Sequence, residues 1–197
     1  MLPMTPGAER MTEAMRSLEA AFLIGVDGVT EIWLVRHADC YQDMSDGANP
    51  ALSSLGRRQA ELLAKRLREL KPAAVYSSPY RRSLETARAI TDDVRVDERL
   101  IEMKMELSDD GGLDFKEVPA TTIERMSAAI NDIASAHRGE RVIVVAHGAA
   151  MVMYLTHVLR LEPGQLRMLP YYTSVSVVRV LGERQIVGSL GDTAHLE

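Results

Sequence analysis

The sequence has one cysteine, Cys40, and lacks the apolar run of about 20 residues that a helix needs to cross a bilayer. A single cysteine excludes an internal disulfide framework and is compatible with a reducing compartment. There is also no secretory signal, because Glu9, Glu13 and Glu19 interrupt the segment where a basic and then an apolar stretch would lie. We therefore expect a cytoplasmic protein that does not bind membranes.

The sequence also has no excess of positively charged residues: its net charge is -5 and its isoelectric point is about 5.6. Such a chain is a poor ligand for nucleic acids or anionic lipid, so we expect neither as a partner. Any anion site must then be a local pocket. With 197 residues, of which 46% are apolar, the chain is long enough to bury one sizeable core.

Strand-like and helix-like segments alternate along the chain. Short apolar runs predict strands at 32–35, 73–76 and 141–146, helical patterns follow at 53–70, 79–86, 121–137 and 149–159, and 174–187 is typical of a hairpin. This alternation predicts an α/β fold: a three-layer sandwich with a mostly parallel central sheet and helices on both faces. The acidic segment 106–114 contains Gly111 and Gly112, and we expect a mobile loop without regular structure there.

The N-terminal segment has a separate pattern. Met11, Met15, Leu18 and Phe22 recur at helical spacing before glycines break the pattern. We therefore expect residues 1–28 to form a helical extension and residues 29–197 to form the main domain. The apolar stripe would pack either against that domain or against a second subunit, in which case the protein would be a homodimer.

Three of the predicted strands end in polar residues. Arg36 and His37 follow the first strand, Ser77 and Ser78 precede the helix that carries Arg82, and His147 follows the third strand. Ligands of open α/β sheets bind beyond the carboxyl ends of the strands, so these side chains are expected to converge. Guanidinium groups match phosphate oxygens, and a neutral imidazole is a nucleophile. The pattern predicts phosphoryl transfer from a small phosphorylated substrate through a phosphohistidine.

The residues also carry a family resemblance. The motifs are Leu34-Val35-Arg36-His37-Ala38, 52–60 (LSSLGRRQA), 77–87 (SSPYRRSLETA), Leu100-Ile101-Glu102, 144–148 (VVAHG) and 192–196 (DTAHL). In order and spacing this set resembles the histidine phosphatase superfamily. The resemblance implies that His37 is the nucleophile, that Arg36, Arg82 and His147 bind phosphate, and that Glu102 is the proton donor, with no metal or other cofactor.

Three positions depart from the family pattern. Ala38 replaces a glycine, and Asp43 stands where many members have a phosphate-binding asparagine. Glu106 occupies the place of another glycine, which makes it a rival of Glu102 for the role of acid. Arg81 is likewise a rival of Arg82 for phosphate binding, although the spacing from Ser77-Ser78-Pro79 favours Arg82.

Other readings of the same residues stay open. His37, Asp39 and His147 would suit a metallohydrolase, although two neighbouring arginines would repel a divalent cation. A non-catalytic phosphate-binding module would keep the arginines but would not need both histidines. Within the family, the short acidic insertion favours hydrolysis over phosphoglycerate mutase-type transfer.

The remaining histidines and the cysteine are expected to have structural roles. We expect packing for His157, a helix C-terminal contact for His137, a structural role for His195 at the chain end, and an inert thiol for Cys40.

Overall fold

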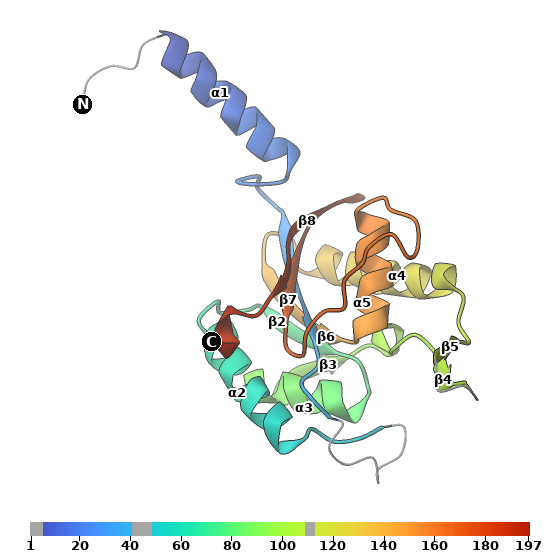
Figure 1. The fold of residues 1–197 in the computed structure, drawn as a ribbon. Helices are drawn as coiled ribbons and strands as arrows, with labels where there is room; N and C mark the ends of the chain where they lie inside the picture. The colour runs from blue at the N-terminus through green and yellow to red at the C-terminus, as the bar shows by residue number, and fades with distance from the viewer. Residues whose placement is uncertain (1–5, 41–48, 109–112) are drawn as a thin grey trace.

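The computed structural model describes residues 6–40, 49–108 and 113–197 (Figure 1). The elements are, in chain order, α1 (Pro6–Ala21), β1 (Thr30–Arg36), α2 (Ser54–Arg68), β2 (Ala74–Ser77), α3 (Arg81–Ile90), β3 (Val94–Val96), η2 (Glu98–Leu100, 3-10), β4 (Met105–Leu107), β5 (Leu113–Phe115), α4 (Pro119–Ala136), β6 (Arg141–Ala146), α5 (Gly148–Val158), β7 (Val175–Leu181), β8 (Arg184–Asp192) and η3 (Ala194–Leu196, 3-10). No helix among these is long and apolar enough to cross a membrane.

The central sheet has the strand order β3-β2-β6-β1-β7-β8. The first four strands of this order run parallel to one another, and β7 and β8 are added antiparallel at one edge. The expected mostly parallel sheet is therefore confirmed, as is the C-terminal hairpin. Ser53 caps α2, because its side chain accepts a hydrogen bond from the Gly56 amide.

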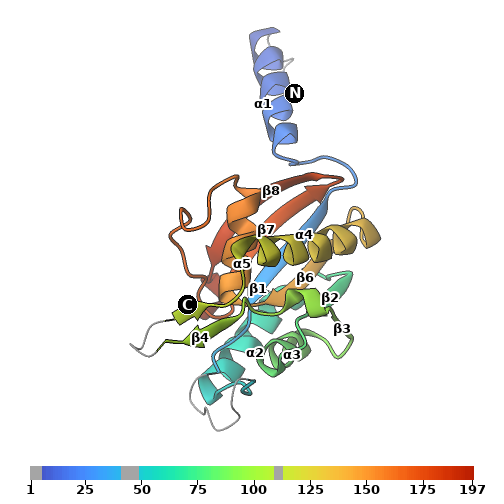
Figure 2. The same cartoon turned by 90° about the vertical axis from the view of Figure 1, so that its right-hand side faces the viewer.

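Helices cover both faces of the sheet, which confirms the three layers (Figures 1 and 2). Successive strand residues point to opposite faces, so that Ile32 and Leu34 of β1 pack with α4 and α5, whereas Val35 packs with α2 and α3. β6 is buried on both faces from Val142 to Ala146, as expected of a central parallel strand.

The N-terminal helix α1 projects away from the sheet and its helices (Figures 1 and 2). Its apolar stripe is uncovered: Met11, Met15, Leu18 and Phe22 are 66%, 48%, 52% and 50% exposed. In this arrangement the stripe does not pack on the chain's own domain. The extension at 1–28 and the homodimer both remain predictions.

Two local expectations were wrong. Part of the supposed loop at 106–114 is an antiparallel pair, in which Met105 of β4 lies opposite Phe115 of β5. The alternation of apolar and acidic residues around Glu106 and Asp114 is a strand pattern that the two glycines obscured; residues 109–112 lie outside the described part of the chain. His157 is exposed on α5, so packing does not explain it.

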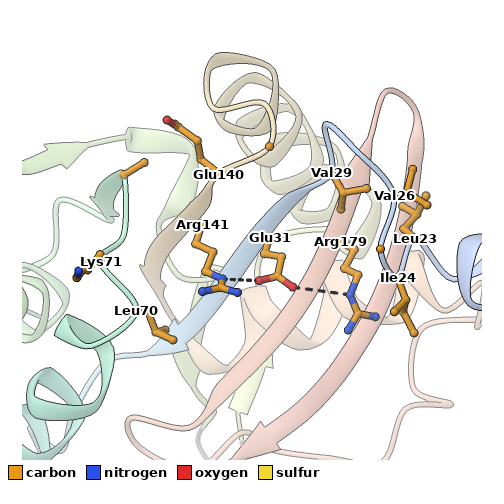
Figure 3. Close-up of a pocket in the computed structure, with 13 residues that line it drawn as sticks. Leu23, Ile24, Val26, Val29, Glu31, Leu70, Lys71, Glu140, Arg141 and Arg179 are labelled. Atoms are coloured by element: carbon orange, nitrogen blue, oxygen red, sulfur yellow. Dashed lines mark hydrogen bonds and ion pairs between the residues drawn. The ribbon is translucent and has the colours of Figure 1, made fainter. Parts of the chain in front are cut away.

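A cavity of about 490 Å³ lies at the amino ends of β1 and β6 (Figure 3). Glu31 lies between Arg141 and Arg179 there, at 2.9 and 3.9 Å, which makes a cross-strand ion-pair ladder. The residues singled out by the motifs follow the opposite, carboxyl ends of the same strands, so this cavity is separate from them.

Candidate active site

The strand register brings the two motif histidines together. Arg36 at the end of β1 lies opposite Ala146 at the end of β6, so the residues that follow, His37 and His147, are neighbours. The amide of His37 donates to the Ala146 carbonyl at 3.0 Å, and the two imidazole rings lie 5.1 Å apart. Parallel pairing of adjacent strands thus assembles the site.

His37 presents an unprotonated nitrogen to its neighbours. Its Nδ1 lies 2.8 Å from the carbonyl oxygen of Ala38, which can only accept, so Nδ1 carries the proton and Nε2 the lone pair. Burial lowers the pKa of His37 to about 3, against the opposing effect of the Ala38 hydrogen bond, and the charges of Arg82 and Arg36 also lower it. The imidazole is therefore neutral at physiological pH.

The two candidate arginines of α3 have different environments. Arg82 is only 8% exposed, and its Nε donates to Nε2 of His37 at 3.2 Å. Arg81 is exposed and pairs with Glu85 at 2.8 Å along the helix. The geometry brings Arg82 and not Arg81 to His37, as its motif position predicts.

His147 is the N-cap residue of α5 and is fully buried. Its Nε2 lies 2.8 Å from the hydroxyl of Ser78 and 3.3 Å from that of Ser83, while Nδ1 has no hydrogen-bond partner among the described residues. Burial lowers the pKa of His147 well below its usual value, and repulsion from a protonated His37 and from the Arg82 guanidinium lowers it further. Both histidines of the site are therefore uncharged.

Arg36 is held by a segment from the far end of the chain. Its Nη1 donates to the carbonyl of Pro170 at 2.6 Å, and its Cζ lies 4.1 Å from the centre of the Tyr172 ring. A Cβ atom at Gly148 would lie 3.3 Å from Nε of Arg36, so the missing side chain at 148 leaves room for the guanidinium. Nε of Arg36 is buried without a hydrogen-bond partner in the described structure.

The two candidate acids are held differently. The Glu102 carboxylate accepts from the amides of Ala149 and Ala150, at 3.3 and 2.9 Å, in the first turn of the helix that His147 caps. The Glu106 side chain is 71% exposed on β4 and lies 3.6 Å from Lys116. Glu102 is therefore held close to the strand ends that His37 and His147 follow, whereas Glu106 lies on an exposed hairpin.

Asp39 forms structural hydrogen bonds through both its side chain and its backbone. Its carboxylate accepts from the Ser53 hydroxyl at 2.5 Å, and its amide donates to Gln59 at 3.0 Å. A Cβ at Gly56 would lie only 1.9 Å from the Asp39 carbonyl oxygen, so α2 can approach this loop only with glycine there. Asp39 thus joins the loop to α2, and the described residues include no group of three or more His, Cys, Asp and Glu arranged to hold a metal ion.

Four other residues were singled out from the sequence, either as departures from the family pattern or as structural residues. Ala38 is buried and donates its amide to Thr86, whereas Asp43 lies outside the described residues. Cys40 is buried, and burial raises the pKa of its thiol, in agreement with an inert role. His137 caps α4, as expected of a helix C-terminal residue, and bonds Glu140 at 2.9 Å.

Three residues of the site were not singled out from the sequence as contacting the histidines and arginines. They are Tyr80, Ser83 and Tyr172. Tyr80 lies 5.1 Å from the His147 ring and 4.9 Å from Cζ of Arg82. The sequence offered a signal for Tyr80, because a residue directly after Pro79 lies at the start of the helix that carries Arg82. Nothing near Tyr172 in the sequence marks it, because its partner lies more than 130 residues earlier.

The proteins to which this chain is similar belong to one family. The model of the histidine phosphatase superfamily (branch 1) matches residues 32–122 and 106–193. A metal-independent phosphoserine phosphatase of Arabidopsis thaliana is 30% identical, over 85% of this chain and 84% of its own length. A probable phosphoglycerate mutase, GpmB, of Yersinia enterocolitica is 27% identical, over 85% and 95% respectively.

Solved structures share the fold. A phosphoserine phosphatase from Entamoeba histolytica, crystallised with 3-phosphoglyceric acid, superposes with a TM-score of 0.74 at 20% identity, over 85% of this chain and all of that one (100%). YhfR of Bacillus stearothermophilus has a TM-score of 0.71 at 25% identity, with the same coverage of 85% and 100%. A family model that spans most of the chain, together with this fold, establishes that the protein belongs to the histidine phosphatase superfamily.

Proposed function

We propose that this protein is a metal-independent phosphomonoesterase that forms a phosphohistidine on His37. The observation that carries the proposal is the neutral imidazole of His37, whose unprotonated Nε2 lies 3.2 Å from the Arg82 guanidinium. A buried lone pair beside a permanent positive charge is suited to attack an anionic phosphoryl group, because the cation attracts the phosphoryl oxygens to the nucleophile.

In the first half-reaction, Nε2 of His37 forms a bond to phosphorus as the bond to the leaving oxygen breaks. Negative charge on the equatorial oxygens is stabilised by Arg36, Arg82 and His147. The Ser78 hydroxyl accepts from the Tyr80 amide at 3.3 Å, and we infer that it donates its own proton to Nε2 of His147, which lies 2.8 Å away, so that the imidazole proton is on Nδ1. That buried donor lacks an acceptor among the described residues, and a phosphoryl oxygen would supply one.

Glu102 gives its proton to the leaving alkoxide and then, as a carboxylate, takes a proton from the water that attacks the phosphohistidine. The products are an alcohol and inorganic phosphate, and His37 regains its lone pair. Fixation of Glu102 at the start of α5 supports it over Glu106, whose carboxylate is exposed and paired with Lys116.

Hydrolysis is favoured over mutase activity by the charge of the β4–β5 hairpin. Lys116 lies 3.6 Å from Glu106 and 3.5 Å from Asp114, so its charge is balanced by two carboxylates. A mutase must keep a doubly phosphorylated intermediate bound, and an acidic hairpin does not favour this. The names of the relatives make phosphoserine and 3-phosphoglycerate the first substrates to test.

The test is a panel of phosphomonoesters assayed with and without EDTA, vanadate and 2,3-bisphosphoglycerate, with His37→Ala as a control for contaminating phosphatases. We expect turnover that survives EDTA, is blocked by vanadate and does not need the bisphosphate. Activity lost on chelation and restored by a divalent ion would support the metallohydrolase instead. Activity that required the bisphosphate would support the mutase.

A further inference from the structure

The Glu102 carboxylate is held by backbone amides from two parts of the chain. It accepts from Ala149 and Ala150 at the start of α5, at 3.3 and 2.9 Å, and from the amide of the next residue, Met103, at 2.8 Å. The amides of a helix's first turn have no partner within the helix, so the carboxylate caps α5. Where this carboxylate lies therefore depends on where the backbone of residues 101–104 lies.

Two side chains hold that backbone from outside the site. They are Arg125 of α4 and Glu117, which lies between β5 and α4. Nη1 of Arg125 donates to the Ile101 carbonyl at 2.7 Å, and the Glu117 carboxylate accepts from the Lys104 amide at 3.0 Å. The main chain is thus fixed both before and after Glu102.

Arg125 and Glu117 also bind each other. Nε and Nη2 of Arg125 donate to the two carboxylate oxygens at 2.9 and 3.2 Å, and the two side chains are 15% and 8% exposed. Burial alone would raise the pKa of Glu117, but hydrogen bonds from Arg125 and from the Lys104 amide lower it below its usual value. A buried ion pair is stable only when its hydrogen bonds are made in full, so the geometry of this pair is narrowly defined.

We propose that the Arg125–Glu117 pair is a positioning device that holds Glu102 in place for proton transfer to the leaving group. This proposal rests on the proposed function, in which Glu102 is the acid. A proton donor must lie within hydrogen-bond reach of the leaving oxygen, and a displacement of about 1 Å can cost roughly 100-fold in rate. Both residues act through the backbone, since each bonds a main-chain atom close to Glu102.

The experiment compares kcat/KM on an alkyl phosphate with kcat/KM on an activated aryl phosphate, because only the alkyl substrate needs the proton of Glu102. Arg125→Met keeps the length of the side chain but removes the guanidinium. It should lower the alkyl-to-aryl ratio of kcat/KM by about 10- to 100-fold. A wild-type ratio in the folded variant would overturn the proposal.

Arg99→Met is the matched control. The Arg99 side chain forms ion pairs with Asp97 and Asp132, at 2.7 and 2.6 Å, just before the same segment. Its carbonyl, which also accepts from Arg125 at 2.8 Å, is unchanged in the variant. Arg99→Met should therefore remove ion pairs nearby and leave the ratio at its wild-type value.

A second variant, Glu117→Gln, keeps the test decisive if Arg125→Met does not fold. Glutamine keeps the shape and can still accept from the Lys104 amide, but it loses the charge that binds the guanidinium through two oxygens. The alkyl-to-aryl ratio should fall in this variant too, by less than in Arg125→Met. If only Glu117→Gln folds, a wild-type ratio in it would overturn the proposal.

A double variant distinguishes positioning from a general loss of structure. Arg125→Met in a Glu102→Gln background should lower the ratio no further, because the group that it positions is already lost. A further fall would overturn the proposal, since Arg125 would then act by another route. Burial is the largest cause of the lowered pKa of His147, and the charge of Arg125 adds to it. His147 serves both substrates, so a change there moves the two kcat/KM values together.

Hydrogen exchange measured by NMR gives a readout that does not depend on activity. The Ala150 amide, which donates to Glu102, should exchange faster in Arg125→Met than in the wild type, relative to the amides of β6, and Arg99→Met should keep the wild-type rate. Unchanged exchange in folded Arg125→Met would overturn the positioning role even if the enzyme is a phosphatase. Faster exchange combined with a wild-type ratio in Glu102→Gln would instead contradict the acid role of Glu102 in the proposed function, and with it the purpose of the positioning.

Discussion

Nε of Arg82 donates a hydrogen bond to Nε2 of His37 over 3.2 Å, so the guanidinium rests on the nitrogen that we propose as the nucleophile. This hydrogen bond occupies the lone pair of Nε2. For Nε2 to attack as proposed, the Nε–H of Arg82 must turn to another acceptor, and an oxygen of the phosphoryl group is one.

His37→Ala should abolish both turnover and the acid-labile phosphoenzyme, because it removes the only atom proposed to bond to phosphorus. Arg82→Ala should leave a detectable phosphoenzyme that forms at least 100-fold more slowly, on the scale of losing one charge-stabilising donor, roughly 10²- to 10³-fold. Rapid-quench labelling with a ³²P-phosphoester measures both. His157→Ala is the matched control, since this histidine is exposed on α5 and should change neither quantity. Burst labelling that persists in His37→Ala would place the covalent bond elsewhere.

The two candidate acids, Glu102 and Glu106, can be distinguished by the leaving group of the substrate. An alkyl phosphate needs protonation of its leaving oxygen, whereas an activated aryl phosphate departs with little help. Glu102→Gln should therefore slow the alkyl substrate by roughly 10²- to 10⁴-fold and the aryl substrate far less. Glu106→Gln, the matched variant on the exposed hairpin, should treat both substrates like the wild type. The opposite result would mean that the hairpin closes over the site and supplies the acid.

The lowered pKa of His37 predicts how stability depends on pH. Between 6.5 and about 3, the unfolded chain binds a proton at His37 that the folded protein does not. The free energy of unfolding must then fall as the pH drops below about 6.5. Above pH 7 His37 is unprotonated in both states, so it does not make the free energy of unfolding depend on pH.

Urea unfolding of wild type and His37→Gln at pH 7, 6 and 5 measures this contribution. Well below pH 6.5 the wild-type curve should be steeper by about 1.4 kcal/mol per pH unit, the value for one proton. His147, whose pKa is lowered chiefly by burial, contributes in the same direction in both proteins, so the difference between the two curves reports mainly His37. Parallel curves would show that His37 titrates normally in the folded state.

The N-terminal extension should be dispensable for chemistry, because its apolar stripe precedes every motif residue. Deleting residues 1–28 should leave turnover per folded molecule near that of the full chain while lowering either the melting temperature or the oligomeric mass. Leu18→Glu in the full chain should reproduce the change in mass if a second copy covers the stripe, and Ser17→Glu, which is exposed beside the stripe, should not. Light scattering coupled to gel filtration measures the mass. A folded truncation without turnover would contradict the prediction.

The residues that the sequence identified best are those whose position follows from local periodicity. Strand runs that end at His37 and His147 needed only parallel pairing to bring the two rings to 5.1 Å. The spacing from Ser77-Ser78-Pro79 favoured Arg82 over Arg81, and of these two consecutive residues it is Arg82 that bonds His37. The role of Tyr172 could not be predicted. Its contact with Arg36 depends on the path of the segment before β7, which no local sequence pattern specifies. The β4–β5 pair was missed for a different reason, since three-residue strands carry too little pattern to outweigh two glycines.

The reversed direction of β7 brings a distant part of the chain to the site. Because β7 runs antiparallel to β1, its beginning lies at the same sheet edge as His37, and the connection from α5 enters the site there. The inner end of this connection, Pro170 to Thr173, is fixed on Arg36, whereas Leu169 just before it is 71% exposed. A substitution at the exposed Leu169 is therefore expected to leave the contacts that Pro170 and Thr173 make with Arg36 in place.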